Sequence, residues 1–474
     1  MFHGLTFLIR ARLLLAAVTL SVAPLSAQTR AENWKVGVAT RTLTPEGPMW
    51  MAGYANRTIP STGVDLDIFG KALAVQDARE QRVVIVTLDL IGIPRSLRVH
   101  VERECGSRFG LKPHEILLNA SHTHCGPLVT PDRMELERTF SRASSPEQVK
   151  AVNDYSGFLE KTVVELIGAS LENPVAAKLE FSHARAGFAM NRRRPEPNGT
   201  YSNNPYPQGP VDHDVPVLKI TGANGKLNAV LFGYACHNTT LSSSRINGDY
   251  AGYAQQYLET SFPGATALFM MGCGGDQNPY PRGNTMVPDQ PTEELVKHHG
   301  RALALAVATA LGTRQRPVGG PLRSALAYAD LDYEPLSAER LNSFRALEHT
   351  PPVIARAQAL LQAQQRGEHP APFACPVQVL RFGGDLTLVA IGGEVVIDYA
   401  LRLKSELKGP AAVWVAGYSN DVFGYLGSRR VIEEGGYEGI EANIRILNHP
   451  GRFAPAAEDR IVAKVHELHA QTQP

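Results

Sequence analysis

The sequence predicts an α/β fold, built as one large domain in which mixed β-sheets are flanked by helices. Apolar, β-branched runs of strand length alternate with amphipathic helical patterns along the whole chain, which is the pattern of this class. The chain has 474 residues, of which 43% are hydrophobic and 20% charged, as in a globular protein with a sizeable core. Similar strands lie on both sides of the Pro/Gly/Asn-rich stretch 192–210, so we interpret that stretch as a long loop and not as a domain linker.

The N-terminal residues have the features of a secretory signal peptide. Arg10 and Arg12 precede an apolar run from Leu13 to Leu25, and small residues follow it. An uncleaved membrane anchor is the alternative, but the run is short for a bilayer span, which needs about 20 residues. We therefore expect residues 1–27 to be a signal peptide and the protein to be secreted or periplasmic.

The predicted elements follow one another in a regular order. Proline and capping residues mark helix starts, as at Pro94 and at Ser145 with Gln148, and Gly312 marks a helix end. The expected strands are 71–78, 82–93, 115–121, 215–221, 227–235, 265–272, 385–394 and 412–420. The expected helices are 94–110, 145–173, 292–312 and 456–471, and the polar, helical region 338–373 is expected to form a surface excursion.

Net charge and cysteine content limit the kinds of partner and of cross-link that the protein can have. A net charge of +1 without a dense basic run argues against a nucleic-acid partner. The five cysteines include no CxxC pair, so a disulfide is conceivable in an exported protein but its partners cannot be assigned from the sequence.

Two histidines in "NASHTHCGP" follow an apolar run. On a strand, His122 and His124 would point to the same side, while Thr123 points away. They could therefore bind one metal ion or one substrate. On this stretch alone, a pair of hydrogen-bonded histidines is an equally good interpretation.

Two further polar residues stand where an apolar strand ends. His237 in "LFGYACHNTT" is a candidate ligand, although a single histidine in such a place is more often structural. Glu394 in "LVAIGGEVV" follows two glycines, and burying an unpaired carboxylate is costly. Metal ligation, an ion pair or a helix-start carboxylate would each explain it.

Two glycine-rich segments complete the candidates. The stretch 417–439 holds Tyr418, Tyr425 and Tyr437 among glycines, and its composition alone indicates only an aromatic loop. The stretch "MMGCGGDQNPY", which includes Asn278, predicts a tight turn whose backbone N–H groups could bind an anion, or simply a strand-to-loop junction. Together the candidates lie at the ends of buried strands, where α/β folds place their active sites.

At this point the chain resembles the neutral (non-lysosomal) ceramidases. The resemblance covers about residues 35 to 450, and "HTHCGP" together with the tyrosine loop is its most specific part. The other matching pieces are "VGVATRTLTP", "MNRRRP", "ACHNTT", "GCGGDQNP" and "GGEVV".

The resemblance implies a zinc site and a set of catalytic residues. It implies that Zn²⁺ is held by His122, His237, Glu394 and Tyr425. It further assigns catalytic roles to His124, Arg192 and Tyr437; Tyr437 stands twelve residues beyond Tyr425, as the family pattern requires. Cys125 and Cys236 are the competing donors, but on a strand they would face away from the neighbouring ligands.

Two departures from the family pattern shape the expected function. The motif Gly-Asp-x-Ser-Pro, which carries the family's proposed nucleophilic serine, reads "GDQNP" here, so that Asn278 replaces the serine. Asparagine is not a nucleophile, but its amide can donate a hydrogen bond. Full-length ceramidases also continue into an immunoglobulin-like domain, and we expect residues 33–474 to form the zinc hydrolase domain alone.

We therefore expect an exported amidohydrolase that cleaves an N-acyl bond by a zinc-activated water, with Asn278 assisting. The substrate would be a small-molecule or lipid amide, with peripheral contact to a membrane surface if it is a lipid. A hydrolase of a more polar amide or ester, such as a sugar or peptide derivative, is the first alternative. A zinc-containing binding protein without turnover is the second. The sequence does not indicate an oligomeric state.

Overall fold

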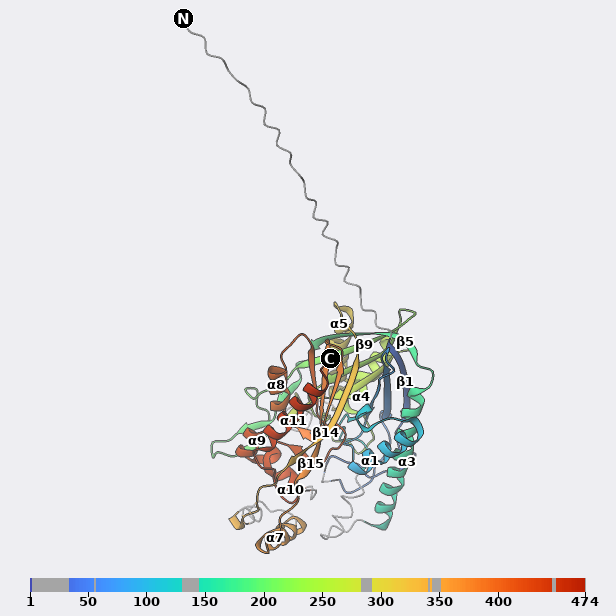
Figure 1. Ribbon diagram of the computed structural model, residues 1–474. Coiled ribbons are helices and arrows are strands. Elements are labelled where there is room, and N and C mark those ends of the chain that lie inside the picture. The colour runs from blue at the N-terminus through green and yellow to red at the C-terminus, as the bar shows by residue number, and fades with distance from the viewer. Residues whose placement is uncertain are drawn as a thin grey trace. The chain divides into compact units, whose positions relative to one another are not determined.

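Two large β-sheets lie face to face in the middle of the protein (Figure 1). Among the described residues, the first sheet has nine strands in the order β11-β10-β9-β5-β1-β2-β3-β4, with β13 paired to β5. The second has four, in the order β14-β15-β16-β18. The strands of the first sheet are β1 (Trp34–Thr42), β2 (Phe69–Gln76), β3 (Arg82–Leu88), β4 (Ile116–Ala120), β5 (Val175–Arg185), β9 (Asp214–Gly222), β10 (Leu227–Tyr234), β11 (Thr266–Met271) and β13 (Arg316–Val318). Those of the second are β14 (Leu322–Leu331), β15 (Phe373–Phe382), β16 (Leu386–Ile391) and β18 (Ala412–Ala416).

The computed structural model describes Met1 and residues 34–54, 57–129, 145–282, 292–339, 342, 351–445 and 449–473. Apart from Met1, the predicted signal peptide, residues 1–27, lies outside them. Residues 32–474 form one compact unit. No described helix has the length and hydropathy needed to cross a bilayer.

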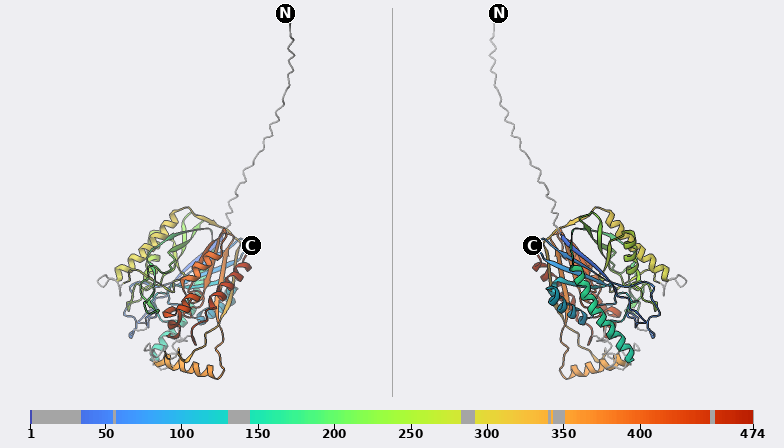
Figure 2. Two further views of the ribbon diagram at one scale, coloured as in Figure 1. Left: turned by 90° about the vertical axis from the view of Figure 1, so that its left-hand side faces the viewer. Right: turned by 90° about the vertical axis from the view of Figure 1, so that its right-hand side faces the viewer.

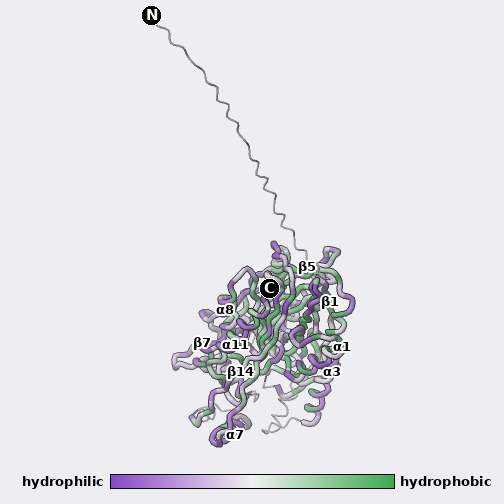
Figure 3. Tube along the Cα trace, in the orientation of Figure 1, coloured by the Kyte–Doolittle hydropathy of each residue, from purple (hydrophilic) through white to green (hydrophobic). Residues whose placement is uncertain are grey.

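The strands are apolar on both sides because both sides are covered. In β3, Val83 and Ile85 point between the two sheets, whereas Val84 and Val86 point to the helices on the other side. Successive side chains of a strand alternate between the two faces, so one continuous apolar run supplies two separate cores. Figure 3 accordingly shows the hydrophobic segments concentrated in the middle of this unit.

Helices cover both outer faces, which gives four layers in the order helix, sheet, sheet, helix (Figure 2). The first sheet is covered by α1 (Arg95–Phe109), α3 (Pro146–Leu171), α4 (Asp249–Ser261) and α5 (Thr292–Gly312). The second is covered by α8 (Ile397–Glu406), α9 (Arg429–Glu434) and α11 (Ala457–Gln471). The predicted fold class, mixed sheets flanked by helices, is confirmed.

Several predicted elements are found and others need correction. The capping box of α3 forms as predicted, since Ser145 Oγ accepts from Gln148 N and the Gln148 side chain returns to Ser145 N. The stretch 192–210 is not purely a loop, because β7 (Arg193–Pro195) and β8 (Tyr201–Asn203) form a short hairpin in it. In the described part of region 338–373, α7 (Pro351–Gln365) extends past the ends of β14 and β15 (Figure 1).

Both sheets contribute strand ends to one region. The strand pairs β3–β4, β10–β11 and β16–β18 are parallel. Asn119 on β4 joins these ends: its Oδ1 accepts from Met271 N on β11 (2.8 Å), and its Nδ2 donates to Gly417 O after β18 (2.8 Å). The edge strands of the first sheet are thus linked to each other and to the second sheet.

Candidate metal centre and active site

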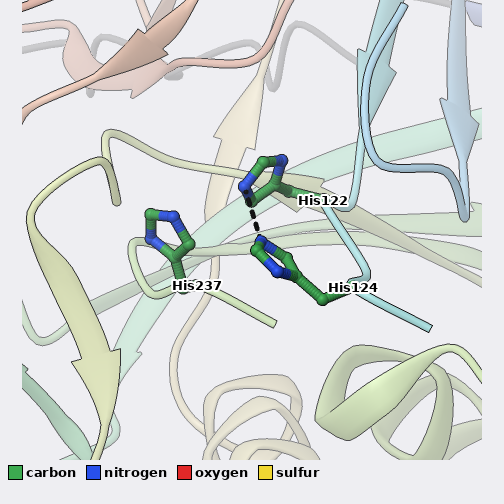
Figure 4. Close-up of side chains that lie close together, drawn as sticks. All are labelled: His122, His124 and His237. Atoms are coloured by element: carbon green, nitrogen blue, oxygen red, sulfur yellow. Dashed lines mark hydrogen bonds between the residues drawn. The ribbon is translucent and has the colours of Figure 1, made fainter. Parts of the chain in front are cut away.

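His122 comes into the site through a turn. The strand β4 ends at Ala120, and His122 has a left-handed backbone with φ 63°. The predicted strand alternation for His122 and His124 is therefore wrong, although their rings do meet, with the two Nε2 atoms 3.1 Å apart (Figure 4). His122 Nδ1 lies 2.6 Å from the Ile91 carbonyl oxygen. A carbonyl can only accept a hydrogen bond, so the proton sits on Nδ1 and Nε2 carries a lone pair.

His237 is oriented in the same way from the end of β10. Its Nδ1 donates to the Gly274 carbonyl at 2.7 Å, and its side chain is fully buried. Burial, with the positive charge of Arg192, lowers its pKa to about 3. The ring is therefore neutral, and its Nε2 lone pair faces His122, Glu394 and Tyr425.

Glu394 and Tyr425 are brought together by a two-residue parallel ladder. The strands β17 (Glu394–Val395) and β19 (Tyr425–Leu426) pair directly, with Glu394 opposite Tyr425. The turn before Glu394 needs glycine, because Gly393 has φ 84° and packs against Phe423.

The four predicted ligands converge within the distances that a metal ion requires of its ligand atoms. Glu394 Oε2 lies 3.2 Å from His122 Nε2 and 3.4 Å from His237 Nε2, and Tyr425 Oη lies 3.2 Å from His237 Nε2. Among the described residues, Glu394 Oε2 accepts no hydrogen bond. Lone pairs of two imidazoles and a carboxylate thus face one another without a proton between them, an arrangement that fits a cation, and N and O donors of this kind suit Zn²⁺.

His124 lies beside this set. The three rings of His122, His124 and His237 bring ligand atoms within 4.8 Å of one another, so His124 could also hold a metal ion. Burial and the two other histidines hold the pKa of His124 well below its usual range.

Sequence reasoning missed the wall behind His124. A Cβ on Gly53, which has φ 94°, would lie 2.6 Å from the His124 ring, and the Tyr54 ring lies 4.9 Å from it. Among the described residues, no group pairs with His124 Nδ1. A single glycine without a recognised motif gave no signal.

Arg192 and Asn278 lie next to the ligand set. The strands β6 (Ala189–Asn191) and β12 (Gln277–Pro279) pair, which brings both residues to one place. Arg192 is buried; its Nη2 donates to Tyr425 Oη (2.9 Å) and its Nη1 to Asn278 Oδ1 (3.1 Å). Thr239 Oγ1 also donates to Asn278 Oδ1 (3.3 Å). Two donors on Oδ1 fix the orientation of the amide, so that Nδ2 is the donor.

Tyr437 borders the same space. Its ring lies edge-on to Tyr425 at 5.3 Å, and the Arg192 guanidinium lies 5.7 Å from its centre. It begins a π-helical turn, Tyr437–Glu441. The structure therefore brings together all eight residues that the sequence singled out for metal binding or catalysis.

One match with a known family decides to which family the chain belongs. The sequence pattern of the family described as "Neutral/alkaline non-lysosomal ceramidase, N-terminal" matches residues 34–271, half of the chain. The chain belongs to this family. The matched segment contains His122, His124, Arg192 and His237, whereas the other four site residues lie beyond it.

Individual relatives of this ceramidase-family chain are distant. It is 23% identical over 507 aligned positions to the neutral ceramidase of Pseudomonas aeruginosa, covering 90% of this chain and 71% of the relative. It is 24% identical to neutral ceramidases B and A of Dictyostelium discoideum, covering 51% and 55% of this chain. It spans only 35% and 38% of the lengths of those two relatives.

Solved structures show the same fold. The crystal structure of the Pseudomonas aeruginosa neutral ceramidase superposes with a TM-score of 0.70 at 19% identity, covering 92% of this chain and 75% of the other. A structure described as ceramidase complexed with C2 gives a TM-score of 0.68 at 20% identity, covering 94% and 77%.

The thiols of Cys125 and Cys236, the competing donors, face backbone carbonyls in this ceramidase-family chain. All five are buried and free, so the structure contains no disulfide between them. Cys125 Sγ lies against the Leu241 and Ser243 carbonyls and Cys236 Sγ against the His237 carbonyl, all at 3.7–3.9 Å. Burial raises the pKa of Cys125 to about 12, which keeps it a thiol.

Proposed function

We propose that the protein is an exported, zinc-dependent hydrolase that cleaves an N-acyl amide bond. The observation that carries the proposal is the convergence of the donor atoms of His122, His237, Glu394 and Tyr425 in a member of the ceramidase family. In this proposal these four residues hold Zn²⁺. When bound, Zn²⁺ supplies the acidity that makes water nucleophilic near neutral pH.

The remaining site residues would orient the substrate and move protons. His124 would accept a proton from the attacking water and return it to the leaving amine. Tyr437 would donate to the substrate's polar head or to the developing oxyanion, together with Asn278 Nδ2. Arg192 would add its positive charge to this side of the site through Tyr425 and Asn278. In this scheme no protein nucleophile is needed.

For the substrate we propose a lipid amide of the ceramide type, which is the substrate that the names of the relatives indicate. Such a substrate would bring the enzyme to a membrane surface. Asn278 favours a second candidate, a more polar amide or ester, because asparagine stands here in place of the serine of the family motif. For export, we propose that residues 1–27 direct the chain out of the cytoplasm and that residues 33–474 form the hydrolase domain.

Metal content tests the zinc site directly. The purified protein should contain one zinc ion per chain, and His122→Ala and Glu394→Ala should each lose most of it, because each removes one of four donors. His183→Ala is the matched control, since His183 is exposed and, among the described residues, its ion pair is with Asp214. Full zinc occupancy in both site variants would refute the assignment.

A substrate screen tests the reaction. N-acylsphingosines of short and long chain should be compared with N-acyl amino acids and N-acetyl sugars, with and without a chelator. Chelator-sensitive cleavage of acylsphingosines supports the lipid amide, and chelator-sensitive cleavage of polar amides alone supports the second candidate. No cleavage of any compound would leave a zinc-binding protein without turnover. A fluorophosphonate should not inactivate the enzyme, and stoichiometric labelling of a serine would overturn the water mechanism.

A further inference from the structure

Glu438, which no motif singled out, is buried directly behind the site. It follows Tyr437 in the π-helical turn, and its relative exposure is 3%. Its Oε1 accepts from Arg192 Nε at 2.7 Å and its Oε2 accepts from Arg193 Nη1 at 2.8 Å. Burial would raise its pKa, but the two guanidinium groups hold the pKa below its ordinary value, so Glu438 is charged.

The hydrogen bonds of the Glu438 carboxylate differ from those of an ordinary arginine–carboxylate ion pair. An arginine–carboxylate pair commonly uses two parallel bonds from one guanidinium. Here Glu438 takes one bond from each arginine, and from Arg192 it takes Nε. Both terminal nitrogens of Arg192 therefore stay available for Tyr425 and Asn278.

The local backbone is shaped to bring Glu438 to this position. Gly435 and Gly436 have φ 74° and 71°, which side chains rarely adopt, and a Cβ on Gly439 would overlap the Val431 carbonyl. Single π-helical turns occur frequently at functional sites. Buried ion pairs are poor sources of stability, since their desolvation offsets the attraction. A functional role is the better explanation for this arrangement.

We propose that Glu438 is a positioning residue of the site: it anchors Arg192 at Nε so that Nη2 holds the Tyr425 hydroxyl among the metal donors. This inference rests on the proposed function, in which the site holds a metal ion. Residues that orient a metal ligand typically change metal affinity or activity by about 10–100-fold when they are altered.

The test compares Glu438→Gln with Glu434→Gln. Glu434 is a matched control because it also bonds Arg193, at 3.1 Å, but its other partners among the described residues, which include Arg430 and Tyr201, do not include Arg192. We expect Glu438→Gln to lower zinc affinity, measured by competition with a chromophoric chelator, about tenfold and to lower kcat with little change in KM. Glu434→Gln should change neither. Equal effects of the two variants, or a lower melting temperature of Glu438→Gln with unchanged zinc affinity, would overturn the inference.

A charge-balanced variant covers the case in which Glu438→Gln does not fold. Glu438→Leu combined with Arg193→Met removes one buried charge of each sign and takes the acceptor away from Arg192 Nε. The same loss of zinc affinity is expected, and wild-type affinity in this variant would refute the positioning role. A crystal structure of either variant gives a readout without metal: Arg192 Nη2 should leave Tyr425 Oη, and a retained bond contradicts the inference. Absence of zinc from the wild-type protein would instead count against the proposed function.

Discussion

At the scale of single residues, two backbone carbonyls decide which nitrogen of His122 and of His237 is free to bind a cation. The Ile91 and Gly274 carbonyls accept the Nδ1 protons of His122 and His237, so both Nε2 lone pairs point inward. A histidine that binds a metal ion regularly donates a hydrogen bond from its other ring nitrogen to such an acceptor. The sequence could name the two histidines, but the two carbonyls belong to segments that no pattern connects with them.

Gly53 provides a test of the role of His124. In Gly53→Ala the new Cβ would lie 2.6 Å from the His124 ring and must displace it, and alanine at φ 94° adds backbone strain. We expect kcat to fall about 10–100-fold, since displacing a reacting group by about 1 Å can cost that much. Zinc content should stay unchanged, because His124 is not one of the proposed ligands.

The control for this prediction is Gly47→Ala. No atom outside its own neighbours lies within 4 Å of a Cβ at Gly47, so this variant should keep its activity. Loss of zinc from Gly53→Ala would contradict the assignment and make His124 a ligand, as the grouping of the three histidines also allows.

Sequence reasoning named residues that the structure brings together, and it missed residues that pack behind them. His122, His237 and Glu394 stand out because polar groups at the end of an apolar strand are unusual. Gly53 and Glu438 do not stand out, because a glycine in a loop or a glutamate after a tyrosine has many ordinary explanations. Their importance comes from contacts with segments at least 71 positions away or, for Glu438 and Arg192, 246.

At the scale of elements, strongly apolar runs were predicted well and half-exposed strands were not. The buried strands β3, β4, β11 and β16 all coincide with expected runs. The strands β1, β5, β14 and β15 went unrecognised. The first three have several half-buried or exposed positions, whereas β15 is largely buried but contains Pro376, Gln378 and Arg381. The hairpin β7–β8 was also missed, because its Pro- and Asn-rich residues resemble a loop while its pairing depends on only three residue pairs.

The tyrosine loop is supported from behind by the segment 449–453. His449 Nε2 donates to the Phe423 carbonyl at 3.0 Å, and His449 Nδ1 accepts from the Tyr333 hydroxyl at 2.8 Å. The ring is buried among Phe373, Phe423 and Phe453. This burial lowers its pKa to about 4.

His449 should therefore make stability depend on pH. Its folded pKa of about 4 lies below the ordinary value of 6.5, so the unfolded chain binds the proton first as pH falls. The stabilisation is complete above about pH 6.5 and is lost towards pH 4, with a loss of about 2 kcal/mol by pH 5.

Chemical denaturation at pH 7.5 and pH 5 checks this prediction. His449→Phe should be less stable at pH 7.5, because the Phe423 carbonyl loses its donor, but its further loss of unfolding free energy at pH 5 should be smaller by about 2 kcal/mol. An unchanged pH dependence would show that His449 contributes nothing to it.

At the scale of the whole molecule, the site depends on how the two sheets meet. His122 and His237 follow strands of the first sheet, whereas Glu394 follows a strand of the second. The sequence predicts that polar residues gather at strand ends, because parallel strands share an edge. It does not predict that β4 and β11, at opposite edges of one sheet, come together, since this depends on the curvature of nine strands.

Asn119 is the residue that fixes this meeting. Besides its bonds to Met271 N and Gly417 O, its Nδ2 donates to Ser419 Oγ at 3.1 Å, and its side chain is fully buried. An aliphatic residue there would leave the buried Met271 N–H without its acceptor, at a cost of about 1–3 kcal/mol. It would also remove the hydrogen bonds to Gly417 O and Ser419 Oγ, which contribute about 0.5–1.5 kcal/mol each. The loss would weaken the contact between the two sheets. The distance between His122 and Glu394, which follow strands of different sheets, would then be less well fixed.

Asn119→Ala should therefore lower the free energy of unfolding by roughly 3–5 kcal/mol and weaken zinc binding at the same time, although Asn119 contacts no ligand. Chelator competition and chemical denaturation measure the two effects. Asn228→Ala is the control, because Asn228 is a half-buried asparagine near the start of β10, away from the meeting of the sheets, and its loss should change stability by about 0.5 kcal/mol or less. If Asn119→Ala loses stability but binds zinc as tightly as the wild type, the metal centre does not depend on the junction. The four ligands would then be held by their own loops.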